Sequence, residues 1–331
     1  MNTKNLSEGF MRVVSKCNSF LDQGSPWRTA VSSSDLHPEF TGVFRLTEAS
    51  SRKECRPFFI ENKQVGLIRP DILAHLKPYT DVFHIPYSQG NDNIKVHLNP
   101  SLQTFEERSE AVEKVLLDLR EKDVFKTLRG WRDEYFNIWY KFSEPPLMKM
   151  ERAATCLFGV KQYGVHINGW TCHPTKGVCM WIARRSKTKP TWPNMLDNLA
   201  AGGLSSKHNI MECARSECQE EASVPNNLLD NLKPVGTVSY FYEDERGLFP
   251  ECEYIMDLEV PEDFVPQNAD GEVAEFYLWT IQEVLEKTIT SEFKSNSALI
   301  AINFCIRHGL ISPDDEPNYQ QILEGMHAKL T

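Results

Sequence analysis

Three glutamates lie close together in the second half of the 331-residue sequence, at Glu217, Glu220 and Glu221. A helix turns by about 100° per residue, so these spacings place the three carboxylates within an arc of about 100° on one helix face. Like charges so placed repel one another by a few tenths of a kcal/mol per pair. The pattern fits a solvated acidic face, and it also fits a set of oxygen ligands for a divalent cation such as Mg²⁺ or Mn²⁺.

Two arginines, Arg184 and Arg185, end an apolar run upstream of this acidic segment, just before a loop that contains Trp192. A guanidinium group is well suited to contact phosphate. Because neighbouring residues of a strand point to opposite faces, we expect at most one of the two arginines to reach a phosphate.

A further acid for such a site is expected from one of two places. Glu251 and Glu253 alternate along a predicted strand, so both lie on one face of it. Asp270 and Glu272 lie in the loop NADGEV. Each pair is also compatible with an ordinary surface position, and we favour Glu253 and Glu272.

The acidic segment itself is expected to lie on a helix over residues 209–222. Asn209 is a suitable N-cap, Glu212 completes a capping box, and Pro225 follows the end. Upstream, the runs ATCLFGV, YGVHING and GVCMWIARR are predicted strands. Downstream, VGTVSYFY and ECEYIMDLEV are strands that flank the turn EDERG, and helices follow at about 280–287 and 295–308.

The first part of the chain has a different character. Apolar spacings of three and four predict an amphipathic helix over 5–22, and a capping box from Thr104 to Glu107 opens a second helix over 104–122. Between them lie predicted strands at 42–46, 56–60 and 64–68, the last two forming a hairpin, and a short helix over 70–77. The segment SEPPLM, at 143–148, cannot continue a regular element. We therefore predict a smaller α+β module over 1–147 and a second domain over 148–331.

The segment around the three glutamates resembles the signature of Nudix hydrolases. Counted from Gly202, that signature is matched in register by Glu217, Cys218, Glu220, Glu221 and Val224. Three positions depart from it: His208 stands at the first Glu, Ser216 at the Arg, and Ser223 at the last Gly. In the family that first Glu and the Arg generally form a structural ion pair, and losing both together leaves no unpaired charge.

The resemblance extends along nearly the whole chain. The motifs VGLIRP, GWRDE, WIARRS, TWPNMLDN, ECQEEAS and FKSNSALIAINFCIRHG occur in the order found in Nudix proteins that are fused in some species to thiamine pyrophosphokinase. The resemblance implies an α/β fold, a Nudix α/β/α sandwich with a mixed sheet. It also implies Mg-dependent hydrolysis of thiamine diphosphate, and preferentially of its damaged oxo and oxy analogues, to the monophosphate plus phosphate.

The same resemblance, together with the candidates above, assigns roles to residues of this chain. The expected metal ligands are Glu217, Glu220, Glu221 and Gly202. The expected catalytic residues are Glu220, Glu221 and Glu272, and the expected substrate-binding residues are Arg184, Arg185, Trp192 and Glu253.

Other interpretations of these features remain open. The altered positions of the signature allow a degenerate Nudix module that binds a ligand without turnover, and another nucleoside- or isoprenoid-linked diphosphate is an alternative substrate. Cys172 and His173 resemble part of a diphosphate isomerase motif, although they precede WIARRS instead of following the tryptophan-bearing loop. The segment from Trp131 to Glu134 either packs the two modules together or holds the aromatic end of a substrate.

The charge balance disfavours polyanionic partners. Lys and Arg total 36 against 46 Asp and Glu, a net charge of −10, so neither nucleic acid nor an anionic membrane is expected as a partner. The nine cysteines include no Cys-x-x-Cys pair, and no apolar run approaches the roughly 20 residues of a membrane helix. We expect a cytoplasmic protein that acts on a small-molecule diphosphate; its oligomeric state does not follow from the sequence.

Overall fold

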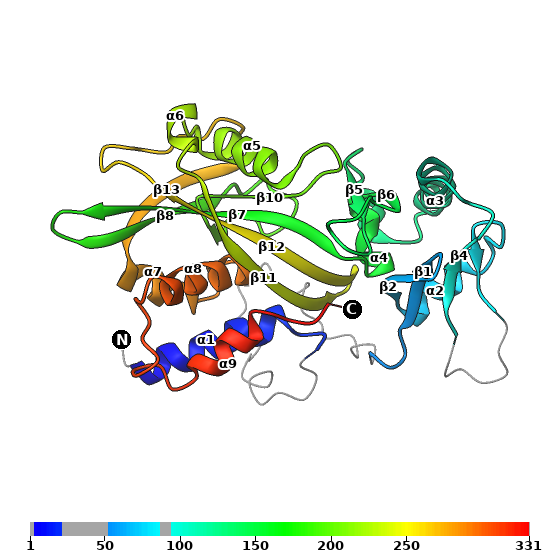
Figure 1. Ribbon diagram of the computed structural model, residues 1–331, viewed down its shortest axis with the longest axis horizontal. Helices are drawn as coiled ribbons and strands as arrows, with labels where there is room; N and C mark the ends of the chain where they lie inside the picture. Colours follow the sequence, from blue (N-terminus) through cyan, green and yellow to red (C-terminus); the bar gives the residue numbers. More distant parts are fainter. Residues whose placement is uncertain (1–2, 22–51, 87–93, 331) are drawn as a thin grey trace.

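Apolar strands in the second half of the chain assemble into one mixed sheet. The computed structural model describes residues 3–21, 52–86 and 94–330. Five long strands lie in the order β11-β12-β7-β8-β13 (Figure 1): β7 (Gln162–His173), β8 (Gly177–Arg185), β11 (Lys233–Asp244), β12 (Gly247–Glu259) and β13 (Val273–Thr280). Strands β7 and β12 run parallel, and the other neighbours along this order run antiparallel. Two short strands, β9 (Leu196–Asp197) and β10 (Ala200–Gly203), pair with β8 and β7 respectively.

Helices cover both faces of this sheet. Met180 and Ile182 of β8 point into a core shared with α7 (Ile281–Thr288) and α8 (Ser295–Arg307), whereas Trp181 points into a core shared with α5 (Ile210–Ala222). The two-residue period of a strand produces this division. The short α6 (Asn226–Leu229) follows α5 on the same side of the sheet (Figure 1). The predicted α/β/α sandwich with a mixed sheet is confirmed.

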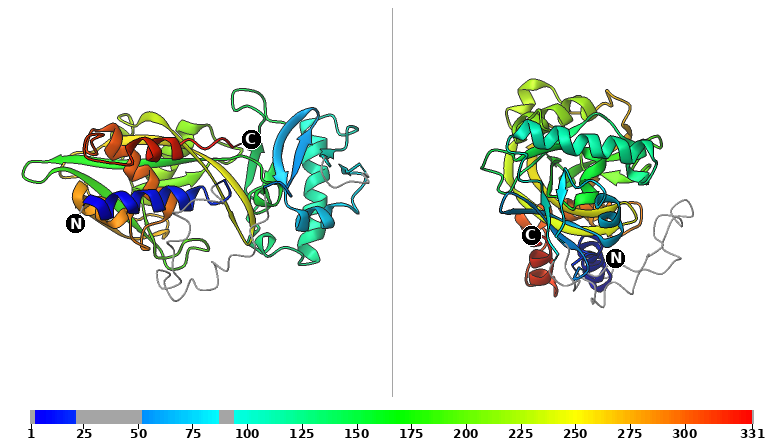
Figure 2. Two further views of the ribbon diagram at one scale, coloured as in Figure 1. Left: turned by 90° about the horizontal axis from the view of Figure 1, so that it is seen from below. Right: turned by 90° about the vertical axis from the view of Figure 1, so that its right-hand side faces the viewer.

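The first helix, α1 (Thr3–Cys17), belongs to this sandwich and not to the module that follows it in the sequence. Phe10, Val13 and Val14 lie in the same apolar core as α8. Figures 1 and 2 place α1 beside α8 and beside α9 (Tyr319–Gly325). We refer to α1 together with residues 162–325 as the sandwich domain.

Helix α1 ends five residues before the predicted end at residue 22. The Asn18 side chain donates to the carbonyl of Gly325 at 2.8 Å and accepts the backbone N–H of Phe241 at 3.3 Å. Side-chain bonds of this kind compete with continuation of a helix. Phe20 then packs in a turn against Phe241, with ring centroids 4.3 Å apart.

The N-terminal module, which we define as residues 56–160, contains a four-stranded sheet in the order β2-β1-β4-β3. Its strands are β1 (Arg56–Ile60), β2 (Lys63–Ile68), β3 (Phe83–His84) and β4 (Val96–Leu98), and its helices include α2 (Pro70–Leu76), α3 (Phe105–Glu121) and the 3-10 helix η5 (Lys126–Gly130). The predicted hairpin and both predicted helices are present, and the capping box from Thr104 to Glu107 starts α3. The predicted strand at 42–46 lies outside the described residues.

The core of this module extends beyond the boundary expected at residue 147. Strand β6 (Met148–Glu151) pairs with β5 (Tyr135–Ile138), and Phe158 and Val160 lie in the module's apolar core. Proline residues in the segment 143–148 therefore mark the turn between two paired strands.

The segment ATCLFGV does not form the predicted strand. Its first residue, Ala154, ends the 3-10 turn η6 (Arg152–Ala154), and the next four residues form the helix α4 (Thr155–Phe158), which ends at Gly159 in the left-handed conformation with φ of 51°. All four residues of α4 are buried, so the segment shows no polar alternation from which a helix could be told from a strand.

Within the described part of the chain, no helix combines the length and apolarity needed to cross a membrane.

Candidate active site

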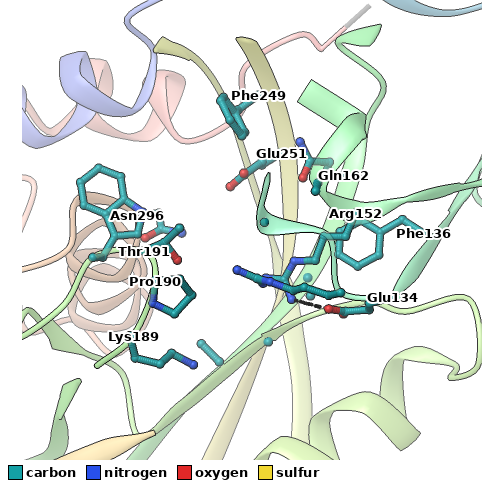
Figure 3. Close-up of a pocket in the computed structure, with 18 of the residues that line it drawn as sticks. Glu134, Phe136, Arg152, Gln162, Lys189, Pro190, Thr191, Phe249, Glu251 and Asn296 are labelled. Carbon is teal, nitrogen blue, oxygen red and sulfur yellow. Dashed lines mark hydrogen bonds and ion pairs between the residues drawn. The ribbon is translucent and has the colours of Figure 1, made fainter. Parts of the chain in front are cut away.

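A cavity of about 660 Å³ lies between the N-terminal module and the sandwich domain. Small-molecule sites typically have volumes of roughly 300–1,000 Å³. In Figure 3, Arg152 of the module and Lys189 and Glu251 of the sandwich domain point into this common space. The acidic residues around it are Glu134, Glu217, Glu220, Glu251, Glu253, Asp270 and Glu272.

Helix α5 positions the carboxylates predicted as metal ligands. Its start is set by the predicted capping box, in which Asn209 accepts the N–H of Glu212 and Glu212 accepts the N–H of Asn209, both at 2.9 Å. Glu217 and Glu220, about one turn apart, line the cavity. Glu221 is buried on the side of α5 that faces β10, where it accepts the N–H of Ala201 at 2.9 Å.

Gly202 lets α5 approach β10 closely. A Cβ atom at this position would lie 1.9 Å from Oε1 of Glu217, well inside van der Waals contact. Only a glycine therefore leaves the Glu217 carboxylate in its place against the backbone of β10. Gly202 pairs with Val165 of β7, which fixes its strand beside the centre of the sheet.

The electrostatics of α5 favour a bound cation. Burial raises the pKa of Glu217 to about 7 and that of Glu221 to about 8, and neighbouring carboxylates add to both shifts. A divalent cation would offset this cost by stabilising the ionised forms, and these hard oxygen donors suit Mg²⁺ or Mn²⁺.

The side chains do not form a closed ligand set by themselves. Among the described residues, no group of three His, Cys, Asp or Glu side chains is arranged to hold a metal ion. Glu220 accepts the Ser216 hydroxyl, and Glu221 accepts a backbone amide. These residues fit an ion that takes its remaining ligands from water and substrate oxygens, which is how Mg²⁺ is commonly bound.

Glu272, the acid predicted from the loop NADGEV, lies at the cavity in an ion pair with Lys189. Burial is the largest single effect on Glu272 and opposes its ionisation, but the hydrogen bond and the charge of Lys189, together with the charge of Arg185, outweigh it and lower the pKa of Glu272. Asp270 also lines the cavity and accepts the backbone N–H of Glu272 at 2.8 Å. The loop thus holds an ionised carboxylate near α5.

Glu251 and Glu253 share one partner, as expected for residues on one strand face. Glu251 lies 2.5 Å and Glu253 2.8 Å from the hydroxyl oxygen of Tyr240, which also accepts the amide of Asn296 at 2.8 Å. A hydroxyl has only one proton to donate, so the second carboxyl contact requires a proton on the carboxyl group. Burial, followed by the charge of Glu251, raises the pKa of Glu253 to about 8.

The two predicted arginines point in opposite directions, and only Arg185 lines the cavity. Its guanidinium is already occupied: it donates to Asp197 at 2.9 Å and to the carbonyls of Thr191 and Trp192 at 3.0 Å. Arg184 donates to Glu292 and does not line the cavity, so the structure does not support its predicted contact with substrate. Strand alternation accounts for the difference.

Arg185 also fixes the loop that carries Trp192. Trp192 lines the cavity with its backbone at φ of 53°, a conformation that is uncommon for a residue with a side chain. Because the Trp192 carbonyl accepts Arg185, the ion pair between Arg185 and Asp197 positions this wall of the cavity.

Cys172, Trp170 and His208 do not line the cavity. Cys172 is exposed near the end of β7, away from the cavity, so the isomerase alternative finds no support. Trp170 packs against Phe304 of α8 with ring centroids 6.0 Å apart. His208 is exposed before the start of α5.

Several residues at the cavity were not identified as site residues from the sequence. Arg132 and Glu134 line the cavity, whereas Trp131 of the same segment packs against the module's core. Arg152 and Lys189 received no role at all. The motif GWRDE could have indicated Arg132 and Glu134 as site residues. Nothing in the sequence spacing of Arg152 or Lys189 relates either residue to α5.

Two family descriptions match consecutive parts of the chain. Residues 39–162 match "Domain of unknown function (DUF4743)", and residues 164–298 match "NUDIX domain". The two matches meet near the point where the core of the N-terminal module ends.

Known proteins match most of the chain. Nudix hydrolase 20, chloroplastic, of Arabidopsis thaliana is 38% identical over 87% of this chain and 77% of that protein. An uncharacterized protein of Saccharomyces cerevisiae is 36% identical over 72% of this chain and 73% of that protein. Among solved structures, the NUDIX domain of Shewanella oneidensis NrtR complexed with ADP ribose matches with a TM-score of 0.37 and 13% identity, over 46% of this chain and 91% of that one. The plant relative is named chloroplastic, and the cytoplasmic location expected for this chain stays a prediction.

Proposed function

This chain belongs to the Nudix hydrolase family, which acts on diphosphate-containing substrates, and we propose that its own substrates are thiamine diphosphate and the damaged oxo and oxy analogues. The proposed reaction adds water across the terminal P–O–P bond. Water oxygen bonds to the terminal phosphorus, the bond to the bridging oxygen breaks, and the products are the monophosphate and inorganic phosphate. The single observation that carries the proposal is the cavity that α5 shares with aromatic and acidic side chains.

One end of this cavity is suited to the diphosphate. Glu217, Glu220 and Glu221, with the backbone carbonyl of Gly202, would hold Mg²⁺ or Mn²⁺ there, in keeping with the general use of divalent metals by Nudix hydrolases. When bound, such an ion neutralises phosphate charge and polarises the scissile bond. The Ser216 hydroxyl and the Ala201 amide orient two of these carboxylates through the hydrogen bonds described above.

Proton transfer from the attacking water requires an ionised carboxylate. Glu272 suits that role, since the hydrogen bond from Lys189 favours its ionised form. Glu253 suits the opposite role, because a carboxyl group with a raised pKa holds its proton at neutral pH and can donate a hydrogen bond.

Another part of the cavity suits a planar heterocycle. Phe249 stacks on Tyr242 with ring centroids 4.6 Å apart and an interplanar angle of 3°, and both line the cavity together with Phe136. Glu251, labelled beside Phe249 in Figure 3, offers a hydrogen-bond acceptor next to these rings. A flat aromatic ring with amino or ring N–H groups, as in the pyrimidine of thiamine, complements such a wall.

The test is a phosphate-release panel at fixed Mg²⁺. We expect turnover of thiamine diphosphate and a higher kcat/KM for its oxo and oxy forms, with nucleotide sugars, dinucleotides and isoprenoid diphosphates poor. If ADP-ribose or a dinucleotide exceeds every thiamine compound by tenfold, the substrate assignment is wrong while the hydrolase class stands. Tight binding of these compounds without phosphate release would instead support the ligand-binding alternative.

A further inference from the structure

We propose that the N-terminal module is one wall of the active site, where Arg132 and Arg152 bind the phosphate groups of the substrate. This inference rests on the proposed hydrolysis of a diphosphate in the same cavity. It assigns a binding role to a module whose family description carries none, and it concerns residues outside the Nudix signature.

The cations that the sandwich domain contributes to the cavity are already paired. Asp197 lies 2.9 Å from Arg185 and 3.6 Å from Lys294, Glu272 pairs with Lys189, and Asp244 lies 2.5 Å from Arg246. These ion pairs leave little positive charge for a ligand. A substrate with several negative phosphate charges needs further unpaired positive charge, because the cavity is also lined by carboxylates.

Arg132 supplies a cation with no such partner. Its guanidinium makes no hydrogen bond or ion pair with any residue of the described ranges 3–21, 52–86 and 94–330, yet Arg132 lines the cavity. Its backbone N–H donates to the Glu151 carboxylate at 3.1 Å, which anchors the main chain while leaving the side chain available. Burial, followed by the charge of Arg152, lowers the pKa of Arg132, and the charges of Glu134, Glu151 and Glu272 act in the opposite direction without offsetting these effects.

Arg152 is anchored but only partly occupied. One nitrogen, Nη1, makes both contacts with Glu134, at 2.9 and 3.2 Å, and the guanidinium lies over the Phe136 ring at 5.4 Å from its centroid. Within the described part of the chain, Nη2 and Nε make no hydrogen bond. Figure 3 shows the guanidinium projecting from this pair into the cavity. A fixed guanidinium with free N–H groups is a strong arrangement for binding phosphate oxygens.

Arg152 also lies next to the proposed metal site. A Cβ atom on Gly203 would lie 2.6 Å from the Phe136 ring and 3.5 Å from Cζ of Arg152. Gly203 directly follows Gly202, whose position abuts the Glu217 carboxylate. The module therefore places Arg152 against the end of strand β10, one residue from the position that abuts Glu217, and both Arg152 and Glu217 line the cavity.

Binding of inorganic pyrophosphate in the presence of Mg²⁺, measured by isothermal titration on the full chain, tests this inference without requiring turnover. We expect Arg132→Ala and Arg152→Ala each to raise the Kd at least about tenfold, and Arg152→Lys to give a smaller increase because it keeps the charge but loses the planar fork. The matched control is Arg129→Ala, since Arg129 lies in the same module, pairs with Asp123 at the surface and does not line the cavity.

Kinetics with thiamine diphosphate and ADP-ribose give the second measurement. For whichever compound the wild type hydrolyses, KM should rise in both alanine variants and stay within twofold in Arg129→Ala. Unchanged pyrophosphate affinity in variants that keep the wild-type melting temperature would overturn the inference, as would a wild type that does not bind pyrophosphate. If the wild type binds pyrophosphate through the arginines but hydrolyses nothing, the proposed function fails and the phosphate site stands.

Discussion

The Ser216 hydroxyl donates a hydrogen bond to Oε1 of Glu220 at 2.5 Å, one turn further along α5. In the Nudix signature that this segment resembles, an arginine stands at the position of Ser216. The serine cannot form the ion pair expected of that arginine, but it orients a carboxylate of the proposed metal site. The serine that stands in place of the arginine therefore still contacts a carboxylate on the acidic face of α5.

Restoring the arginine alone should not help the protein. Ser216→Arg is expected to lower stability or leave it unchanged, because the new guanidinium has no partner carboxylate at position 208. The double variant His208→Glu with Ser216→Arg should be better tolerated, with a coupling free energy of at least about 0.5 kcal/mol in a double-mutant cycle. Urea unfolding of the four proteins measures it, and additive effects would show that the two positions are not linked.

Removal of one α5 carboxylate should abolish most activity while leaving the fold intact. Glu220→Gln or Glu221→Gln is expected to lower kcat at least about a hundredfold, since each variant loses one ligand of the divalent cation whose charge would stabilise the transition state. Glu259→Gln, at an exposed carboxylate at the end of β12, is the matched control. A single α5 variant that keeps more than half the wild-type rate at saturating Mg²⁺ would show that the assigned site is wrong.

Gly202→Ala should separate activity from stability. The added Cβ would overlap Oε1 of Glu217, the mobile end of a side chain, so the carboxylate can turn away at little cost to folding. We expect kcat/KM to fall at least about tenfold and the Mg²⁺ requirement to rise, because small misplacements of catalytic groups have large effects on rate. Melting temperature and Mg²⁺ titrations check both parts; a variant with wild-type Mg²⁺ dependence contradicts the role given to Glu217.

Stability of the metal-free protein should fall as the pH rises from about 5 to about 8. Burial first, and neighbouring carboxylates second, raise the pKa of Glu217 to about 7 and that of Glu221 to about 8. The pKa of an unfolded glutamate is about 4.3, so over this range the folded state holds more protons and unfolding becomes easier as the pH increases. The charged groups acting on the two carboxyls are Glu220, Glu272, Asp197, Arg152 and Lys189.

Thermal unfolding in EDTA across this pH range makes the comparison. Glu221→Gln cannot ionise at that position, so its stability should depend less on pH than that of the wild type. Added Mg²⁺ should stabilise the wild type most at the upper end of the range, where the carboxylates are ionised. Identical pH profiles for the two proteins would contradict the assigned burial of Glu221.

The site residues that lie on a single helix or strand could be predicted from the sequence. The capping box at Asn209 and the spacing of Glu217, Glu220 and Glu221 predict α5 and its acidic face, because both depend only on neighbours along the chain. Alternation also predicts that Arg184 and Arg185 diverge, although not that Asp197 and two carbonyls occupy Arg185.

The site residues that distant segments contribute could not be predicted from the sequence. Arg152 reaches the cavity because β6 and η6 bring the end of the N-terminal module against β10, and Lys189 reaches it because its loop pairs with Glu272. No local spacing encodes either approach. The helix α4 was missed for a related reason: its four side chains are all buried, so the pattern carries no information about which face is exposed.

The packing of α1 against α8 and α9 makes the sandwich domain discontinuous, with the N-terminal module inserted between its first helix and its sheet. During synthesis, the apolar face of α1 emerges long before the helices that cover it. The inserted module can complete its own core before the helices that cover α1 are synthesised, so the sandwich domain can close only after α8 and α9 have emerged. A truncated protein that begins at the Nudix match would leave apolar surface of α8 uncovered, and its aggregation would say nothing about where catalysis occurs.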